Sequence, residues 1–444
     1  MAQTLVTDVQ ALTDEAVRHL QELLRLDTTN PPGNETLVVN YLADVLRREG
    51  YQPTVVESGP GRGNLVVRFP GTGEREPLLI YGHVDVVTAE PEHWTHAPFS
   101  GDVAEGCVWG RGALDMKSMV AHELMVMLLL KRQGVPLKRD VIFAATADEE
   151  AGGDAGIGFL VDQHPDLIRA EYGLSEGGGT TMYIAGKAVY DVRTGEKGTC
   201  RFKLRAYGDP GHGSVPRPQT SVSRVAEAVT KLVNTSLPFR PTATFTAFFA
   251  TLTDLLRVPA SKRELNERNL QDVLDLLPPA LARYLYAITR DTATPTGLKA
   301  GSKINVIPTV AEVSVDGRFL PGQTEEGFLA EVRQVIGEGY EIEQLDTGHP
   351  QEDPPGGPLY DTILSVVKRY APDAIVLPMM MSGATDARHV SRLGTKCLGF
   401  DPVRIREDFP AEQLVHGHDE RIPIDGYVWG LQAFYEIVTQ FCSM

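Results

Sequence analysis

The chain has 444 residues, of which 42% are hydrophobic and 23% charged, and its formal net charge is -17. This length suffices for two or three domains with full cores, and the composition is that of an ordinary globular protein. The negative charge argues against nucleic acid or an anionic membrane as a partner, so an anionic substrate would need a local cationic group.

The sequence contains no segment typical of a membrane or secreted protein. Its longest apolar run, residues 124–130, is too short to span a bilayer. The N-terminus lacks the basic and apolar regions of a signal peptide. Four widely spaced cysteines without a C-x-x-C motif suit a reducing compartment. We therefore expect a cytoplasmic protein.

Helical and strand patterns alternate along the N-terminal part. Apolar spacing predicts amphipathic helices over residues 12–24 and 37–46, the first ended by NPPG at 30–33 and the second capped by Gly50. Short apolar runs predict strands at residues 55–56, 64–69 and 78–81. This order predicts an α/β chain.

The strand at 78–81 leads directly into GHVD at 82–85. Because side chains alternate along a strand, His83 and Asp85 project to the same side where it leaves the sheet. Ligands bind at that carboxyl end in open α/β sheets. The pair suits a metal ligand and its supporting partner, although H-x-D taken alone favours a solvent-exposed loop.

A glycine-rich segment, WGRGALDMK at 109–117, precedes an apolar helix predicted over 118–131. The glycines allow a tight backbone path that presents Asp115 before the helix. On local sequence, Asp115 suits either the N-cap of that helix or a metal ligand.

Two further buried strands, predicted at 141–145 and 172–175, also end in carboxylates. The first delivers Glu149 and Glu150, whose like charges would raise one pKa unless a cation neutralised them. A metal would leave one glutamate as ligand and the other as base, whereas a solvated acidic turn is the alternative for this segment alone. The second strand delivers Glu176.

A late strand at 397–400 is followed by HGHDE at 416–420 and a closing helix from about residue 427. The side chains gathered at strand ends are His83, Asp115, Glu149, Glu150, Glu176 and a late histidine. Mixed imidazole and carboxylate ligands of this sort fit two zinc-like ions bridged by one carboxylate.

In combination, the motifs resemble those of the di-zinc aminoacylase and carboxypeptidase family of metallopeptidases. GHVD at 82–85, GRGALDMK at 110–117 and DEE at 148–150 stand in the family's order. The resemblance covers about residues 20–430. It implies a phosphorylase/hydrolase-like three-layer α/β catalytic domain with an inserted α/β sandwich lid that makes a homodimer. The expected divisions are 1–192 (catalytic, first part), 193–320 (lid) and 321–444 (catalytic, second part).

The resemblance also implies a ligand set for two Zn²⁺ ions, for which Co²⁺ or Mn²⁺ would be possible substitutes. Asp115 would bridge the ions, with His83 and Glu176 completing one site. Glu150 and a late histidine would complete the other. His416 is preferred to His418 because HGHDE matches the family's His-x-x-Asn/Asp-Glu pattern from His416.

Two acidic residues would act beside the ligands. Asp85 would orient His83 through its second ring nitrogen, as metal-bound histidines require. Glu149 would be the general base. It would take a proton from the attacking water and return it to the leaving amine.

The middle of the chain resembles the family's lid. Its predicted elements are strands at 198–207, 303–307 and 311–319 and a helix at 222–233. In the family, the histidine that matches His212 reaches into the partner subunit's active site. Taken alone, a glycine-flanked histidine is an ordinary turn residue.

Three further residues match family positions that hold the substrate: Asn305, Arg318 and Gly383. Arginine can grip a carboxylate with two hydrogen bonds, although a strand arginine can equally pair with a nearby acid. Gly383 lies in SGATDAR at 382–388, which resembles the loop that contacts the substrate carboxylate. Ala384 stands where a second glycine is common, so that contact differs in detail.

We therefore expect a zinc-dependent hydrolase that cleaves the amide bond of N-acyl amino acids or a C-terminal peptide bond. Its substrate is a small molecule or peptide with a free carboxylate. A dipeptidase or aminopeptidase of the same family is the first alternative, although these more often carry aspartate at the Glu176 position. A catalytically silent binding relative is the second, although it would not need Glu149, His212 or Asn305.

Overall fold

The computed structural model describes residues 9–444, which fall into two compact units. The first unit comprises residues up to Thr194 together with Pro355–Met379 and Thr385–Met444. The second comprises Gly195–Pro354 and Met380–Ala384. Residues 1–8, which contributed to the signal-peptide expectation, lie outside the described part.

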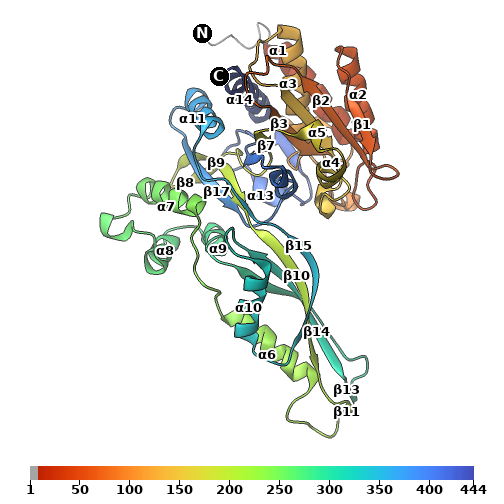
Figure 1. Ribbon diagram of the computed structural model, residues 1–444, viewed down its shortest axis with the longest axis vertical. Coiled ribbons are helices and arrows are strands. Elements are labelled where there is room, and N and C mark those ends of the chain that lie inside the picture. Colours follow the sequence, from red (N-terminus) through yellow and green to blue (C-terminus); the bar gives the residue numbers. More distant parts are fainter. Residues whose placement is uncertain (1–8) are drawn as a thin grey trace. The chain divides into compact units, whose positions relative to one another are not determined.

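A mixed β-sheet forms the centre of the first unit (Figure 1). Its neighbouring strands are, in order, β1 (Thr54–Glu57), β2 (Gly63–Phe69), β6 (Val141–Thr146), β3 (Leu78–His83), β7 (Tyr172–Ser175), β18 (Lys396–Gly399) and β9 (Lys187–Glu196). Strands β6, β3, β7 and β18 run parallel to one another, whereas β1, β2 and β9 pair antiparallel with their neighbours. The carboxyl ends of the four parallel strands therefore meet at one edge.

Helices cover both faces of this sheet. Leu78 and Ile80 belong to one core, which also contains residues of α1 (Val9–Arg25), α2 (Thr36–Arg48), α3 (Lys117–Gln133), α11 (Pro358–Tyr370) and α14 (Ile424–Ser443). Leu79 and Tyr81 belong to a second core, with α4 (Ile157–Gln163), α5 (Pro165–Ile168) and α12 (Ala387–Val390). Successive side chains of β3 thus point alternately into the two cores, and this explains why its sequence is continuously apolar. The predicted α/β fold with three layers is confirmed.

The second unit is built on a four-stranded antiparallel sheet. Its order is β12 (Thr292–Ala300), β14 (Val310–Phe319), β10 (Gly198–Tyr207) and β15 (Glu341–Gly348). One face packs against α6 (Ser221–Asn234) and α10 (Glu325–Ile336). Three more helices lie between α6 and β12 in sequence: α7 (Ala243–Leu255), α8 (Glu267–Leu274) and α9 (Pro279–Ala287).

The second unit extends further along the chain than the segment 193–320 expected from the sequence. Strand β15 pairs with β10, and the buried side chains of α10 belong to the same core as β10 and β14. These pairings place residues 321–354 with the second unit. The sequence motifs alone place these residues in the second part of the catalytic domain, 321–444.

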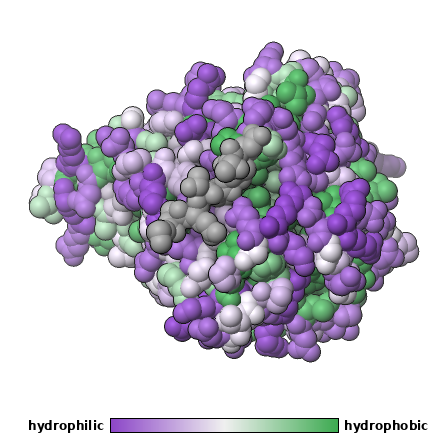
Figure 2. Space-filling model, turned by 90° about the horizontal axis from the view of Figure 1, so that it is seen from above, coloured by the Kyte–Doolittle hydropathy of each residue, from purple (hydrophilic) through white to green (hydrophobic). Residues whose placement is uncertain are grey.

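Hydrophilic residues predominate on the face of the molecule seen in Figure 2, with hydrophobic residues visible between them. A mixed surface of this kind is usual for globular proteins. Within residues 9–444, no helix has the length and apolar character needed to cross a membrane.

Candidate metal centre

Three adjacent parallel strands deliver acidic and imidazole side chains to one edge of the first unit's sheet. His83 is the last residue of β3. Glu149 and Glu150 follow β6 after a short turn, and Glu176 directly follows β7. Because β3 lies between β6 and β7 and runs parallel to both, these side chains converge.

Two groups of potential metal ligands share Asp115. The first consists of His83, Asp115 and Glu176, and the second of Asp115, Glu150 and His416. In each group the ligand atoms all lie within 4.8 Å of one another. His83 Nε2 lies 3.1 Å from Asp115 Oδ1, and His416 Nε2 lies 3.1 Å from Asp115 Oδ2. The two oxygens of one carboxylate therefore face two different imidazoles.

The competing late histidine lies apart from both groups. His418 Nε2 contacts Glu90 Oε2 at 3.2 Å. His416, in contrast, lies 3.3 Å from Glu150 Oε1. The geometry therefore groups His416, the preferred residue, with the carboxylates.

Asp115 is held in place by a buried glutamate from the end of the chain. Helix α3 begins at Lys117 with Met116 as its N-cap, so Asp115 lies outside the capping position. Glu420 Oε1 accepts the N–H groups of Leu114 and Asp115 at 2.7 and 3.1 Å. Its other oxygen accepts from Arg111 Nη1 at 2.6 Å. Glu420 is fully buried and pairs with an equally buried Arg111, an interaction that sequence reasoning missed.

Asp85 contacts His83 chiefly through its backbone. His83 Nδ1 lies 2.9 Å from the Asp85 carbonyl oxygen and 3.4 Å from the Asp85 carboxylate. The carboxylate itself accepts the backbone N–H groups of Glu149 and Glu150, at 3.1 and 3.2 Å. Asp85 therefore fixes the histidine ring and, through its side chain, the turn that bears both glutamates.

The ionisation of the cluster reflects crowded acids in a buried site. Burial, reinforced by the charge of Asp115, raises the pKa of Glu176 to about 8. Burial and then the charge of Glu176 raise the pKa of Glu149. Hydrogen bonds to Asp115 and Glu150 raise the pKa of His416 to about 10. A bound cation would favour the ionised carboxylates and replace the protons on the imidazoles.

Glu149 differs from the other acids because it belongs to neither ligand group. Its Oε2 lies 4.0 Å from His83 Nε2, beside the first group, and its side chain is 16% exposed. Glu149 is therefore adjacent to the potential ligands without belonging to either group.

The four other predicted site residues belong to the second unit. His212 lies on β11 (Gly211–His212), which pairs with β13 (Val306–Ile307). Its Nδ1 lies 2.7 Å from Ser214 Oγ, and the N–H of Gly213 donates to Asn305 O at 2.9 Å. His212 and Asn305 are thus neighbours at an exposed two-stranded antiparallel sheet, and they belong to a different unit from the carboxylate cluster.

Arg318 forms an ion pair with a nearby acid, which is one of the two alternatives that the sequence left open. Its Nε donates to Asp316 Oδ1 at 2.7 Å, and Nη2 donates to Asp316 Oδ2 at 3.2 Å. The two residues are separated by one position on β14, so their side chains share a face of the strand. Two of the guanidinium nitrogens are therefore already engaged.

A buried lysine that the sequence analysis did not single out connects Arg318 with the segment containing Gly383. The N–H of Lys197 donates to Met381 O at 3.1 Å, in the stretch Met380–Ala384 of the second unit. Its Nζ donates to Thr292 Oγ1 at 3.0 Å, and Thr292 pairs with Arg318 across the strands. Burial lowers the pKa of Lys197 to about 7.

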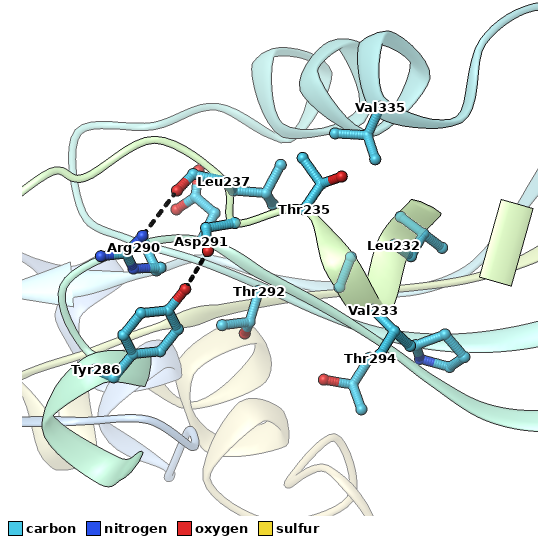
Figure 3. Close-up of a pocket in the computed structure, with 13 residues that line it drawn as sticks. Leu232, Val233, Thr235, Leu237, Tyr286, Arg290, Asp291, Thr292, Thr294 and Val335 are labelled. Carbon is cyan, nitrogen blue, oxygen red and sulfur yellow. Dashed lines mark hydrogen bonds between the residues drawn. The ribbon is translucent and has the colours of Figure 1, made fainter. Parts of the chain in front are cut away.

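A separate cavity of about 280 Å³ lies in the second unit (Figure 3). Its charged lining residues are already paired. Arg290 donates to Leu237 O at 3.4 Å and stacks over the Tyr286 ring, as Figure 3 shows in part. Asp291 accepts from Leu320 N at 2.8 Å. The cavity contains neither a catalytic acid pair nor one of the two ligand groups.

A family model matches most of the chain. Residues 79–440 match the model for peptidase family M20/M25/M40, and the chain belongs to this family. It is 30% identical over 394 residues to a probable carboxypeptidase S-like 2 of Dictyostelium discoideum, a match covering 84% of this chain and 74% of the relative. It is 27% identical over 440 residues to human aminoacylase-1, covering 97% of this chain and 96% of that protein. These matches support a hydrolase.

Two further proteins extend the comparison. Human N-fatty-acyl-amino acid synthase/hydrolase PM20D1 is 29% identical over 383 residues, covering 82% of this chain and 74% of the relative. Among solved structures, an M20 family metallo-carboxypeptidase from Sulfolobus solfataricus has a TM-score of 0.73 at 18% identity, covering 97% of this chain and 100% of that chain. The structural likeness supports the fold.

Proposed function

We propose that the protein is a zinc-dependent hydrolase that cleaves the amide bond of N-acyl amino acids or a C-terminal peptide bond. The observation that carries the proposal is the position of Asp115, whose two carboxylate oxygens each lie 3.1 Å from a different histidine nitrogen. One carboxylate shared by two mixed imidazole and carboxylate sets suits a two-metal site.

The residues present fit two such ions. Each ligand group offers one histidine nitrogen and two carboxylates, a donor set suited to zinc. Glu150 Oε1 is buried and lies 3.3 Å from His416 Nε2, so a metal ion between them would bind a carboxylate and an imidazole together. His83 and Glu176 would hold one ion, Glu150 and His416 the other, and Asp115 both. Bound zinc would polarise the substrate carbonyl and lower the pKa of a bound water to roughly 7.

The chain's own residues account for the proton transfers. Glu149 would accept a proton from water as the water oxygen bonds to the amide carbon. It would then donate that proton to the departing nitrogen as the carbon–nitrogen bond breaks, releasing a carboxylic acid and an amine. His212 would donate a hydrogen bond to the oxyanion, from the partner subunit of a homodimer formed through the 193–320 lid segment.

The proposed substrate carries a free carboxylate beside the scissile amide. That carboxylate would be held by Asn305, Arg318 and Gly383. A local cation is needed there because the protein's net charge of -17 repels an anionic substrate. The names of two relatives, aminoacylase-1 and N-fatty-acyl-amino acid synthase/hydrolase PM20D1, support N-acyl amino acids as the class.

One observation favours a second candidate, a dipeptidase or aminopeptidase. Asp316 already pairs with Arg318, which weakens the case for a substrate carboxylate there. The deciding experiment offers zinc-loaded protein a panel of N-acyl amino acids, their C-terminal amides and dipeptides. We expect the acids to be hydrolysed much faster than the amides. Equal cleavage of acids and amides would favour the second candidate, and no cleavage would favour a silent binding relative.

A further inference from the structure

Arg62 lies in the turn between β1 and β2, where its guanidinium is surrounded by acceptors. Nη2 lies 2.6 Å from Asp148 Oδ1 and 2.9 Å from Glu35 Oε1. Nη1 donates to Pro32 O at 3.0 Å and to Asn30 Oδ1 at 3.4 Å. The side chain is 16% exposed, so this charge is largely withdrawn from solvent.

The chain makes room for this guanidinium with a glycine. Gly33 has a φ of +80°, and a Cβ there would lie 2.7 Å from the Arg62 guanidinium carbon and 2.8 Å from Glu35 Oε1. The backbone conformation therefore favours glycine, and a Cβ at this position would have to displace the Arg62 guanidinium. Gly33 ends the NPPG stretch, so this stretch contributes to the arginine site.

Asp148, the main partner of Arg62, begins the turn that carries Glu149 and Glu150. Its φ is +74°, a left-handed conformation that an aspartate adopts when its side chain is held by local hydrogen bonds. Asp148 Oδ2 accepts the N–H of Ala155 at 2.9 Å, and Oδ1 accepts from Arg62. The conformation of the turn therefore depends on the side-chain contacts of Asp148.

Asn30 connects the same network to Asp85. Its Nδ2 donates to Asp85 Oδ2 at 2.8 Å and to Asp148 Oδ1 at 3.2 Å. Asp85 in turn accepts the backbone N–H groups of Glu149 and Glu150. The turn is thus held at its first residue by Arg62 and at the next two by Asp85.

We propose that Arg62 is a positioning residue that sets the orientation of Glu149 and Glu150 through Asp148 and Asn30. The inference rests on the proposed function, in which Glu149 is the base and Glu150 a ligand. Arginine suits this place because its two terminal nitrogens donate to acceptors on three residues, Asp148, Pro32 and Asn30, and the same charge lies beside Glu35. A lysine would present one compact ammonium and would leave part of this set unpaired.

The test compares Arg62→Ala and Arg62→Lys with Arg68→Ala. Arg68 is a matched control because it follows on β2, and its Nη1 pairs with Asp140 at 2.7 Å on an exposed surface. At saturating zinc we expect the Arg62 variants to lose roughly tenfold to a hundredfold in kcat, because small misplacements of catalytic groups are costly. KM should change less than kcat, and Arg68→Ala should stay near the wild type.

Chemical rescue separates positioning from general destabilisation. Guanidinium ion added to Arg62→Ala should restore part of the lost kcat, whereas methylammonium should not. Failure of guanidinium to rescue a folded Arg62→Ala, or a kcat equal to that of Arg68→Ala at saturating zinc, would overturn the proposal. If Arg62→Ala does not fold, the kcat of Arg62→Lys is compared with that of Arg68→Ala at saturating zinc, and equal values would overturn the proposal.

A spectroscopic readout keeps this inference distinct from the proposed hydrolysis. Co²⁺ bound at the second ligand group should show an altered visible absorption in the Arg62 variants, because Glu150 is displaced. Arg68→Ala should give the wild-type spectrum. If the wild type hydrolyses no substrate, the proposed function fails, and an unaltered Co²⁺ spectrum in the Arg62 variants would separately refute the positioning role.

Discussion

His416 Nε2 lies 3.1 Å from Asp115 Oδ2, although the two residues are about 300 positions apart in the sequence. Their approach adds a second imidazole to a carboxylate that already contacts His83 at 3.1 Å. Asp115 therefore lies between two imidazoles, and the proposed pair of bridged cations would account for this arrangement.

Wild-type protein should bind two divalent ions per chain, and the ligands should not be equivalent. Asp115→Asn should weaken both sites, since Asp115 is common to both groups, whereas Glu176→Gln should weaken one. Metal analysis after zinc saturation measures the ratio. A wild-type stoichiometry near one that excess zinc does not change would contradict the two-metal proposal.

Glu149→Gln should abolish most turnover and leave the metal content intact. The substitution removes a proton acceptor that belongs to neither ligand group. We expect a loss of about a hundredfold to ten-thousandfold in kcat. Glu150→Gln is the control and should lower metal content. If Glu149→Gln loses metal and Glu150→Gln does not, the two roles are exchanged.

His212 should act across a dimer. Mixing His212→Ala subunits with Glu149→Gln subunits should restore activity, because a mixed dimer regains one complete site. Subunit exchange is checked by labelling the two variants differently. Verified exchange without recovered activity would mean that His212 does not act on the partner's site.

Arg318 should determine the preference for a free carboxylate. Arg318→Ala should lose roughly 1.5–3 kcal/mol of discrimination between an N-acyl amino acid and its amide, the range for a charged hydrogen bond. Asp316→Asn, which removes the negative partner of Arg318, should keep the preference for the acid. Comparing kcat/KM for both substrates across three proteins provides the measurement. A preference that survives in Arg318→Ala places the recognition elsewhere.

Glu35 should make stability depend on pH. Burial, with the nearby charges of Asp85 and Asp148, raises its pKa to about 7 from the ordinary 4.5. Between these values the unfolded chain releases the Glu35 proton and the folded protein keeps it. The contribution of Glu35 is therefore fully present below pH 4.5 and is lost as the pH rises through 7.

The pH effect is measured by urea unfolding of wild type and Glu35→Gln. Relative to the variant, the wild type should lose up to about 3 kcal/mol of unfolding free energy across this window. Glu74→Gln, a substitution at an exposed carboxylate, should follow the wild type. A constant difference between wild type and Glu35→Gln at all pH values would contradict the raised pKa.

Much of the first unit could be predicted because its signals are local. The apolar run at 78–81 marked β3, and parallel strands bring their following residues to one edge whatever the loops do. Asp115 was ambiguous because a capping residue and a ligand have the same local sequence. The start of α3 at Lys117 leaves Asp115 outside the capping position, and the contacts of Asp115 with His83 and His416 group it with the potential ligands.

Other features depend on contacts between distant segments and left no local signal. Glu420 belongs to the HGHDE motif, in which only His416 was predicted to have a role. The neighbouring sequence gives no sign that the Glu420 carboxylate accepts the N–H groups of Leu114 and Asp115. Arg62 in GRG at 61–63 has the sequence of an ordinary turn. The extent of the second unit to Pro354 follows from the pairing of β15 with β10, which strand propensity does not specify.

The buried contact between Arg111 and Glu420 has a consequence for biosynthesis. During translation, the segment around Asp115 leaves the ribosome about 300 residues before its glutamate anchor. Until that anchor arrives, Arg111 lacks its buried counter-charge, and the backbone ahead of Asp115 lacks its acceptor. In nascent chains, the backbone at Leu114 and Asp115 should therefore reach its final position only after residue 420 has emerged. A chain released before that point would be left with an incomplete centre, however well its central strands had formed.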